Sequence, residues 1–279
     1  MKLGTWKFRR FYRTGSLKAA ARELARYKLD VLGVQEVRWD KEGTVRAGDY
    51  NLFYRKGNEN HQLGTGFFVH RRLASAVKRI EFVSDRLSYI VLRGCWLHII
   101  LVNVHAPSEE LKDSFYEELE EVFDHSPKYH MKILLGDFNA KVGREDIFKP
   151  IIGQESLHQD SNDNGVRIVN FATSKNLVVK STMFPHRNIH KYTWTSPDGK
   201  THNQIYHVLI DSRWQSSVLD VRIFRGAECD TDHYLVIAKV RERLAVGKQA
   251  TQSLNRHRFN LSKLNELEVR KQYQVEITK

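Results

Sequence analysis

The chain has 279 residues, a length that suits one large α/β domain followed by an extension. Its 45 Lys and Arg residues exceed its 33 Asp and Glu residues, and the resulting formal charge of +12 favours a polyanionic partner. A hydrophobic content of 41% and only 5 prolines exclude a disordered chain, and the longest apolar stretch, residues 96–104, is shorter than the roughly 20 residues that span a membrane.

The N-terminal part of the chain alternates strand and helix patterns. Residues 3–8 and 31–34 are predicted strands, and residues 17–25 carry apolar side chains at helical spacing after Ser16, which we expect to cap the helix. The second strand runs into Glu36. Because α/β sheets commonly place their sites at strand ends, Glu36 is the first candidate functional carboxylate.

Short strand patterns separated by polar or glycine breaks come next. They cover residues 50–54, 66–70, 77–82, 88–92 and 97–105. This succession predicts an antiparallel meander. A predicted helix at residues 112–123 and a strand at residues 132–135 follow, and that strand leads directly into the polar segment Gly136-Asp137-Phe138-Asn139.

The C-terminal half repeats the α/β pattern and then changes character. A helix is predicted at residues 165–177, and strands are predicted at residues 192–194, 205–210, 218–224 and 234–240. Beyond about residue 244 the chain becomes polar, with a short helical candidate at residues 262–273. We therefore predict one domain at residues 1–245 and a polar, partly helical tail at residues 246–279.

The basic residues concentrate at the two ends. Residues 1–30 hold nine Lys or Arg and two acids, a net +7, while residues 241–279 hold nine and four, a net +5. A solvated surface explains any single Lys, but the cluster of Arg9, Arg10 and Arg13 favours nucleic-acid binding.

The cysteines and the N-terminus bear on the cellular compartment. Cys95 and Cys229 are too few for a disulfide framework, and the basic N-terminus lacks the apolar segment of a secretory signal. We expect an intracellular protein, nuclear or cytoplasmic, that is not secreted and does not bind membranes. No feature of the sequence indicates an obligate protein partner.

Four strand-end segments carry the residue types that metal-dependent phosphodiester cleavage needs. Carboxylates hold a hard cation and orient water, while amides and imidazoles stabilise developing negative charge. Any one segment alone is explained as well by turns, caps or surface residues. The segments are Gln35-Glu36, Asn103-Val104-His105, Gly136-Asp137-Phe138-Asn139 and Thr231-Asp232-His233.

The order and spacing of five motifs resemble the endonuclease/exonuclease/phosphatase superfamily. Within it the chain looks like the apurinic-endonuclease-like domain of non-LTR retrotransposons of the RTE/BovB type, a group that includes craniofacial development protein 2-like sequences. The resemblance covers residues 1 to about 245, and the tail is similar to the start of the linker to a reverse transcriptase. The motifs are LGVQE, LVNVHAP, LLGDFNAKVG, YTWTSPDGKTHNQI and TDHY.

This resemblance implies a fold, a metal and a reaction. The fold would be a four-layer α/β sandwich of the DNase I type, in which two mixed β-sheets are flanked by helices. Glu36 would be the Mg²⁺ ligand, with Mn²⁺ as a possible substitute, and Asp232 would complete the acidic cluster on the metal side. The reaction would be phosphodiester nicking of DNA, with RNA as a further possible partner.

The resemblance also implies roles for five catalytic residues. Asp137 would orient the attacking water, and Asn139 would contact the scissile phosphate or support the metal. His233 would be the acid/base or phosphate-stabilising imidazole. Thr193 would donate to the phosphate, and His105 stands where many relatives have a tyrosine near it.

Two positions depart from the family pattern. Lys7 stands where the family's first strand ends in Asn, so its ammonium is expected beside Glu36, where it repels a cation. Tyr206 replaces the Asp that orients the catalytic imidazole. The alternative function is therefore a catalytically dead nucleic-acid-binding remnant of the same fold. A phosphatase or lipid phosphodiesterase is a third interpretation, which the +12 charge disfavours.

Overall fold

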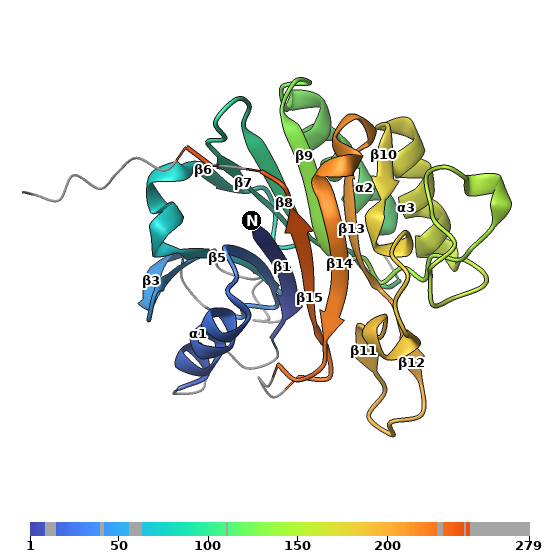
Figure 1. Ribbon diagram of the computed structural model, residues 1–279, viewed down its shortest axis with the longest axis horizontal. Helices are drawn as coiled ribbons and strands as arrows, with labels where there is room; N and C mark the ends of the chain where they lie inside the picture. Colours follow the sequence, from blue (N-terminus) through green and yellow to red (C-terminus); the bar gives the residue numbers. More distant parts are fainter. Residues whose placement is uncertain are drawn as a thin grey trace, which may run out of the picture. The chain divides into compact units, whose positions relative to one another are not determined.

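The computed structural model describes residues 1–8, 15–39, 42–55, 63–109, 111–227, 231–242 and 244–245 (Figure 1). Arg9, Arg10, Arg13 and Cys229 lie outside these residues, as does the tail with its helical candidate. The predicted nucleic-acid contacts and the domain boundary at residue 245 therefore stay predictions. Among the described residues, no helix has the length and apolar character to cross a membrane.

Two mixed β-sheets form the centre of the fold (Figure 1). Strands β1 and β2 run parallel in the first sheet, β8 and β9 run parallel in the second, and the other neighbours are antiparallel. The first sheet has the order β14 (Val218–Phe224), β15 (Leu235–Val240), β1 (Lys2–Lys7), β2 (Val31–Gln35), β5 (Thr65–His70), β4 (Tyr50–Tyr54), β3 (Gly43–Ala47). The second has the order β10 (Leu177–Val179), β13 (Tyr206–Asp211), β9 (Met131–Asp137), β8 (Ile99–His105), β7 (Leu87–Leu92), β6 (Val77–Phe82).

The remaining elements are helices and one small hairpin. Strands β11 (Trp194–Thr195) and β12 (His202–Asn203) pair with each other. The α-helices are α1 (Ser16–Tyr27), α2 (Lys112–His125) and α3 (Asp163–Ser174). The short 3₁₀ helices are η1 (Arg71–Ala76), η2 (Asp146–Phe148), η3 (Lys180–Thr182), η4 (Asn188–His190) and η5 (Ser212–Ser217).

Three apolar clusters hold the layers together. Successive side chains of a strand point to opposite faces, so Val31 packs between the sheets while Leu32 packs under α1. In β9, Ile133 likewise faces the first sheet and Leu134 faces α2 and α3. Helix α1 thus covers one sheet and helices α2 and α3 the other, which confirms the predicted four-layer sandwich.

Several local predictions need correction. The short strands do not form one meander, because η1 carries the chain from β5 in the first sheet to β6 in the second. Strand β3 was missed, since three of its five residues are exposed and its pattern is not apolar. Ser16 is the first residue of α1 rather than its cap, a position that Gly15 takes with a φ of 94°. The third helix begins at Asp163, after Asn162, whose side chain accepts from Gly165 N.

The parallel strand pairs bring four polar strand ends to one edge of the fold. Lys7 pairs with Gln35 at the ends of β1 and β2, and His105 pairs with Asp137 at the ends of β8 and β9. On the other side of β9, Tyr206 pairs with Asp137. The strand-end rule therefore located this edge correctly.

We expect the stability of the protein to fall as the pH drops from 6.5 to about 4, because burial lowers the pKa of His207 to about 4. Its Nε2–H donates to Ala140 O (2.8 Å) and its Nδ1 accepts from Ser181 Oγ (2.9 Å), so the folded state holds the neutral ring. The unfolded chain takes up the proton that the folded chain rejects. The loss reaches about 3 kcal/mol.

Urea titrations between pH 7 and pH 4 measure this loss. His207→Gln should flatten the dependence, and His158→Gln should remove a second part of it, because burial also lowers the pKa of His158 to about 4. The same pH dependence in both variants as in the wild type would contradict the assignment.

Candidate functional site

The ammonium of Lys7 occupies the centre of the polar edge. Its Nζ lies 2.9 Å from Glu36 Oε1, 3.4 Å from Asp137 Oδ2 and 3.3 Å from His105 Nε2. These contacts join the ends of strands from both sheets. A lysine has three N–H donors, so all three have a partner here. The predicted approach of Lys7 to Glu36 is thus seen, and Asp137 and His105 share the same ammonium.

Glu36 is held by cations on both of its oxygens. Lys7 approaches Oε1, and Arg38 Nη2 lies 2.6 Å from Oε2. Both Glu36 and Arg38 have left-handed backbone conformations, with φ values of 56° and 57°. Such values are uncommon outside glycine, so the chain after β2 adopts a costly turn that brings Arg38 back to the carboxylate.

The burial of these groups fixes their charges. Burial raises the pKa of Asp137, and Lys7 and the backbone N–H of Asn139 oppose that rise. Burial by itself disfavours the Lys7 ammonium, but Asp137 and Glu36 outweigh it and raise the pKa of Lys7 above its usual value. Burial, Lys7 and Arg86 hold the pKa of His105 well below its usual range. Lys7 is therefore charged and His105 is neutral, which lets His105 Nε2 accept from the ammonium.

Asp137 and Asn139 form a tight turn after β9. Asn139 N donates to Asp137 Oδ1 (3.1 Å), and Asn139 Nδ2 donates to Ala106 O (2.7 Å). The φ of Asn139 is 48°. Asn and Asp favour such turns because they bond to nearby backbone. Both residues thus have a structural task at the edge where the catalytic roles were predicted.

His233 contacts the phenol of Tyr206, at the position where the family resemblance implies a carboxylate. Tyr206 Oη lies 3.1 Å from His233 Nδ1, and Asp232 Oδ1 lies 3.6 Å from His233 Nε2. Burial, and then Asp137, raise the pKa of Tyr206 well above its usual value, so the phenol is neutral. A phenol hydroxyl can donate one hydrogen bond and accept another, and Tyr206 also has a side-chain hydrogen bond with Asp137, but a neutral hydroxyl does not balance a charge on the imidazole.

Thr193 and Asp232 bind the β11–β12 hairpin to this edge. Thr193 Oγ1 accepts from Ile205 N (2.8 Å) and donates to Asn203 O (3.1 Å). Asp232 Oδ2 accepts from Trp194 Nε1 (2.8 Å). The structure brings both residues next to His233, but their predicted roles toward phosphate and metal stay predictions.

A buried polar layer supports the site from below. Gln35 Nε2 donates to Thr5 Oγ1 (2.9 Å) and to Asn103 Oδ1 (2.5 Å), while Asn103 Nδ2 donates to Val34 O (2.9 Å). A Cβ on Gly33 would stand 2.7 Å from Asn103 Oδ1, so only glycine leaves room for this amide. Asn103 therefore joins the two sheets beneath the site.

Sequence reasoning missed two arginines at the site. Arg38 lies two residues after Glu36, and its return to that carboxylate depends on the left-handed turn, which no pattern announces. Arg86 comes from the segment before β7, and its Nη1 donates to His105 O (3.3 Å). Arg86 is far from the four polar segments along the chain, so no motif indicated it.

The residues at this edge do not fit a divalent cation as they stand. Both oxygens of Glu36 already face cations of the chain, and the Lys7 ammonium lies between Glu36 and Asp137. Among the described residues, no group of three or more His, Cys, Asp or Glu side chains has an arrangement suited to a metal ion. The predicted Mg²⁺ or Mn²⁺ would have to displace the ammonium.

Comparisons with known proteins match this sequence and this fold. The sequence pattern of the endonuclease/exonuclease/phosphatase family matches residues 9–233. Craniofacial development protein 2 of Bos taurus is 31% identical over 253 residues, and the protein of that name from Tragulus javanicus is equally similar. The alignments cover 89% of this chain but 42% and 44% of those proteins, so the chain spans less than half the length of these relatives.

Solved structures share the fold at low sequence identity. The endonuclease domain of TRAS1, a telomere-specific non-LTR retrotransposon, has a TM-score of 0.60 at 13% identity and covers 86% of this chain and 97% of its own. A 3′ phosphatase from Neisseria, bound to a product DNA hairpin, has a TM-score of 0.63 at 21% identity, with coverage of 86% and 99%. An AP endonuclease from Archaeoglobus fulgidus has a TM-score of 0.62 at 16% identity, with the same coverage.

We expect Lys7→Met to destabilise the protein by about 3–5 kcal/mol, because it leaves buried Asp137 without a cation and removes one of the two cations on Glu36. Adding Asp137→Asn should recover part of the loss, since the uncompensated charge is then gone. Guanidinium titrations give these free energies. The matched control is Lys149→Met, which removes an exposed ion pair with Asp146 and should change stability by less than about 1 kcal/mol. Equal losses for Lys7→Met and Lys149→Met would contradict the argument.

Proposed function

Since this chain belongs to the endonuclease/exonuclease/phosphatase family, we propose that it binds the backbone of nucleic acid at the polar edge of its two sheets and that Lys7 has taken the place of the metal there. The observation that carries this proposal is the contact of one ammonium with Glu36, Asp137 and His105. We also propose that the chain descends from a retrotransposon endonuclease. The similarity to the TRAS1 domain supports that descent.

Lys7 supplies charge at the site but not the activation that hydrolysis needs. A bound Mg²⁺ would polarise a phosphate and lower the pKa of a water molecule. Lys7 supplies one positive charge and no such activation, and its three donors already have partners. Arg38 and Arg86 add positive charge around the same edge and can attract a polyanion without any metal.

Tyr206 removes a second requirement for turnover. An imidazole that takes up a proton during catalysis needs a carboxylate to balance its charge, and a neutral phenol does not supply one. In a serine protease, replacing the comparable aspartate lowers the rate by about 10⁴. Although the mechanisms differ, the comparison sets the scale of the deficit that we expect here.

A second candidate function is metal-dependent nicking of DNA by this same site. One specific observation favours it: Glu36, Asp137, Asn139 and His105 still lie at one edge of the sheets, with His233 on the neighbouring strand end. In that case a divalent cation would displace Lys7 during turnover. The two functions differ in whether wild-type protein nicks DNA.

The first test is binding in EDTA. Duplex DNA should bind without metal and should weaken as salt rises, because Lys and Arg contacts release counterions from the phosphates. Arg9→Gln/Arg10→Gln should lower the slope of log K against log salt by about 1.8, and Arg13→Gln should lower it further. Fluorescence anisotropy at several salt concentrations measures the slope.

The matched control for that test changes the same charge elsewhere. Lys78 and Arg79 are the second and third residues of β6, at the end of the second sheet opposite the site, so Lys78→Gln/Arg79→Gln should leave the slope nearly unchanged. Binding that is absent, or that does not respond to salt, would refute the proposed face. Equal effects of the two pairs would show that only net charge matters.

The second test measures nicking of supercoiled plasmid with Mg²⁺. Wild-type protein should be nearly inactive, while Tyr206→Asp should raise the rate and Lys7→Asn/Tyr206→Asp should raise it by at least about 100-fold. Adding His233→Ala or Glu36→Gln should abolish the gain. Calorimetry should show tighter Mg²⁺ binding in Lys7→Asn than in the wild type. If wild-type protein nicks as fast as the double variant and loses that activity with Glu36→Gln, the second candidate function is correct.

A further inference from the structure

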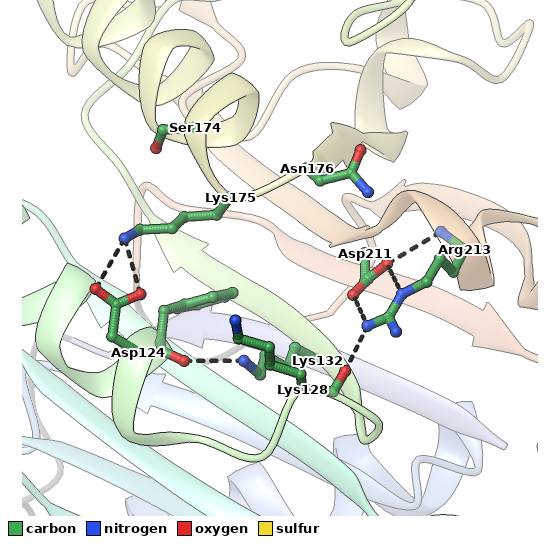
Figure 2. Close-up of a pocket in the computed structure, with 9 residues that line it drawn as sticks. Asp124, Lys128, Lys132, Ser174, Lys175, Asn176, Asp211 and Arg213 are labelled. Carbon is green, nitrogen blue, oxygen red and sulfur yellow. Dashed lines mark hydrogen bonds and ion pairs between the residues drawn. The ribbon is translucent and has the colours of Figure 1, made fainter.

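A separate pocket lies at the opposite end of the second sheet (Figure 2). Its volume is about 500 Å³, and its walls come from the end of α2, the start of β9, the end of α3 and the end of β13. The polar edge lies at the other end of β9, six residues further along. A strand rises about 3.3 Å per residue, so about 20 Å separate the two places. The proposed function does not use this pocket.

The charges around the pocket are unequal. Four cationic side chains face two carboxylates, which leaves a net charge of +2; they are Lys128, Lys132, Lys175, Arg213, Asp124 and Asp211. Both carboxylates are engaged: Lys175 Nζ lies 3.0 Å from Asp124 Oδ1, and Arg213 Nη2 lies 2.5 Å from Asp211 Oδ2. Figure 2 shows these two pairs on either side, with Lys128 and Lys132 between them.

Lys132 is the most unusual of these residues because it is buried, with 7% of its surface exposed. Its Nζ donates to Phe123 O (2.9 Å) and Ser126 O (3.2 Å). An ammonium has three donors, so one more is available, and Lys132 lines the pocket. Burial lowers the pKa of Lys132, although Asp211 and Asp124 oppose this, and an anion held against the ammonium would offset the burial further.

We propose that this pocket binds a phosphate monoester the size of a nucleoside monophosphate, with its phosphate on Lys132 and Lys128. A phosphate monoester carries a charge of about −1.5 to −2 at pH 7, which matches the net +2 of the walls. Lysine binds phosphate as a point charge and does not need the paired donors that Arg213 already uses on Asp211.

The remaining groups suit the rest of such a ligand. The pocket is several times larger than a bare phosphate and leaves space for a sugar and a base. Asn176 lines the pocket from a left-handed position with a φ of 53°, two residues after the end of α3. Figure 2 shows its amide and the Ser174 hydroxyl across the pocket from Lys132. The amide can donate to or accept from ligand hydroxyls, and the Ser174 hydroxyl, which donates to Phe171 O, can accept from one.

Calorimetric titration with AMP, ribose 5-phosphate and inorganic phosphate tests the proposal on the full chain. AMP should bind more tightly than inorganic phosphate, and adenosine should not bind. Lys132→Met keeps the buried aliphatic part of the side chain and should weaken the binding of AMP by about tenfold or more. Lys128→Ala, at an exposed position, should weaken it several-fold without any risk to folding. Lys149→Met is the control and should bind AMP as the wild type does.

The outcomes separate this proposal from the proposed function. No binding of AMP, or equal binding by the wild type and the Lys128→Ala variant, would overturn it. If Lys128→Ala and Lys132→Met instead weaken the binding of duplex DNA and AMP does not bind, the pocket is part of the surface that binds nucleic acid and the proposal is wrong. AMP binding that both variants weaken, with duplex binding unchanged, supports it whether or not the chain nicks DNA.

Discussion

The buried carboxylate of Asp137 is the constraint on which this edge of the protein depends. A carboxylate taken fully out of water needs a compensating cation, and the strand ends offer one place for it. In this chain the cation is the side chain of Lys7. It lies at the end of β1, which runs parallel to β2, and it contacts groups from both sheets. The turn that places Glu36 and Arg38, and the hydrogen bond of the Asn139 backbone to Asp137, both depend on that charge balance.

The polar layer beneath the site has a comparable effect on geometry. Asn103 and Gln35 lie between two sheets that elsewhere meet through apolar side chains, and they bond across the gap. Such bonds hold only in one register of the sheets, so they specify the relative position of β2 and β8 more tightly than apolar packing does. The positions of the polar groups at the ends of these strands are therefore fixed relative to one another.

Much of the fold and part of the site could be predicted from the sequence. Apolar periodicity located most strands and all three helices, and the strand-end rule placed Glu36, His105 and Asp137 at one edge. The division of the strands between two sheets followed from the family resemblance, because periodicity does not say which strands pair. Arg38 and Arg86 were missed because their positions depend on a left-handed turn and on a distant segment. The sequence motif predicted that Lys7 would lie beside Glu36 and repel a metal. Only the structure shows that Asp137 and His105 contact the same ammonium.

Lys7 and Tyr206 stand where the family resemblance implies Asn and Asp, and these differences can be described at the level of codons. Each pair of amino acids has codons that differ by a single base, and the surrounding carboxylates, imidazoles and turns are all still in position. Under the proposed function, two point mutations would therefore separate the present sequence from one with a free Glu36 and a carboxylate beside His233, and no insertion, deletion or repacking of the core would be needed.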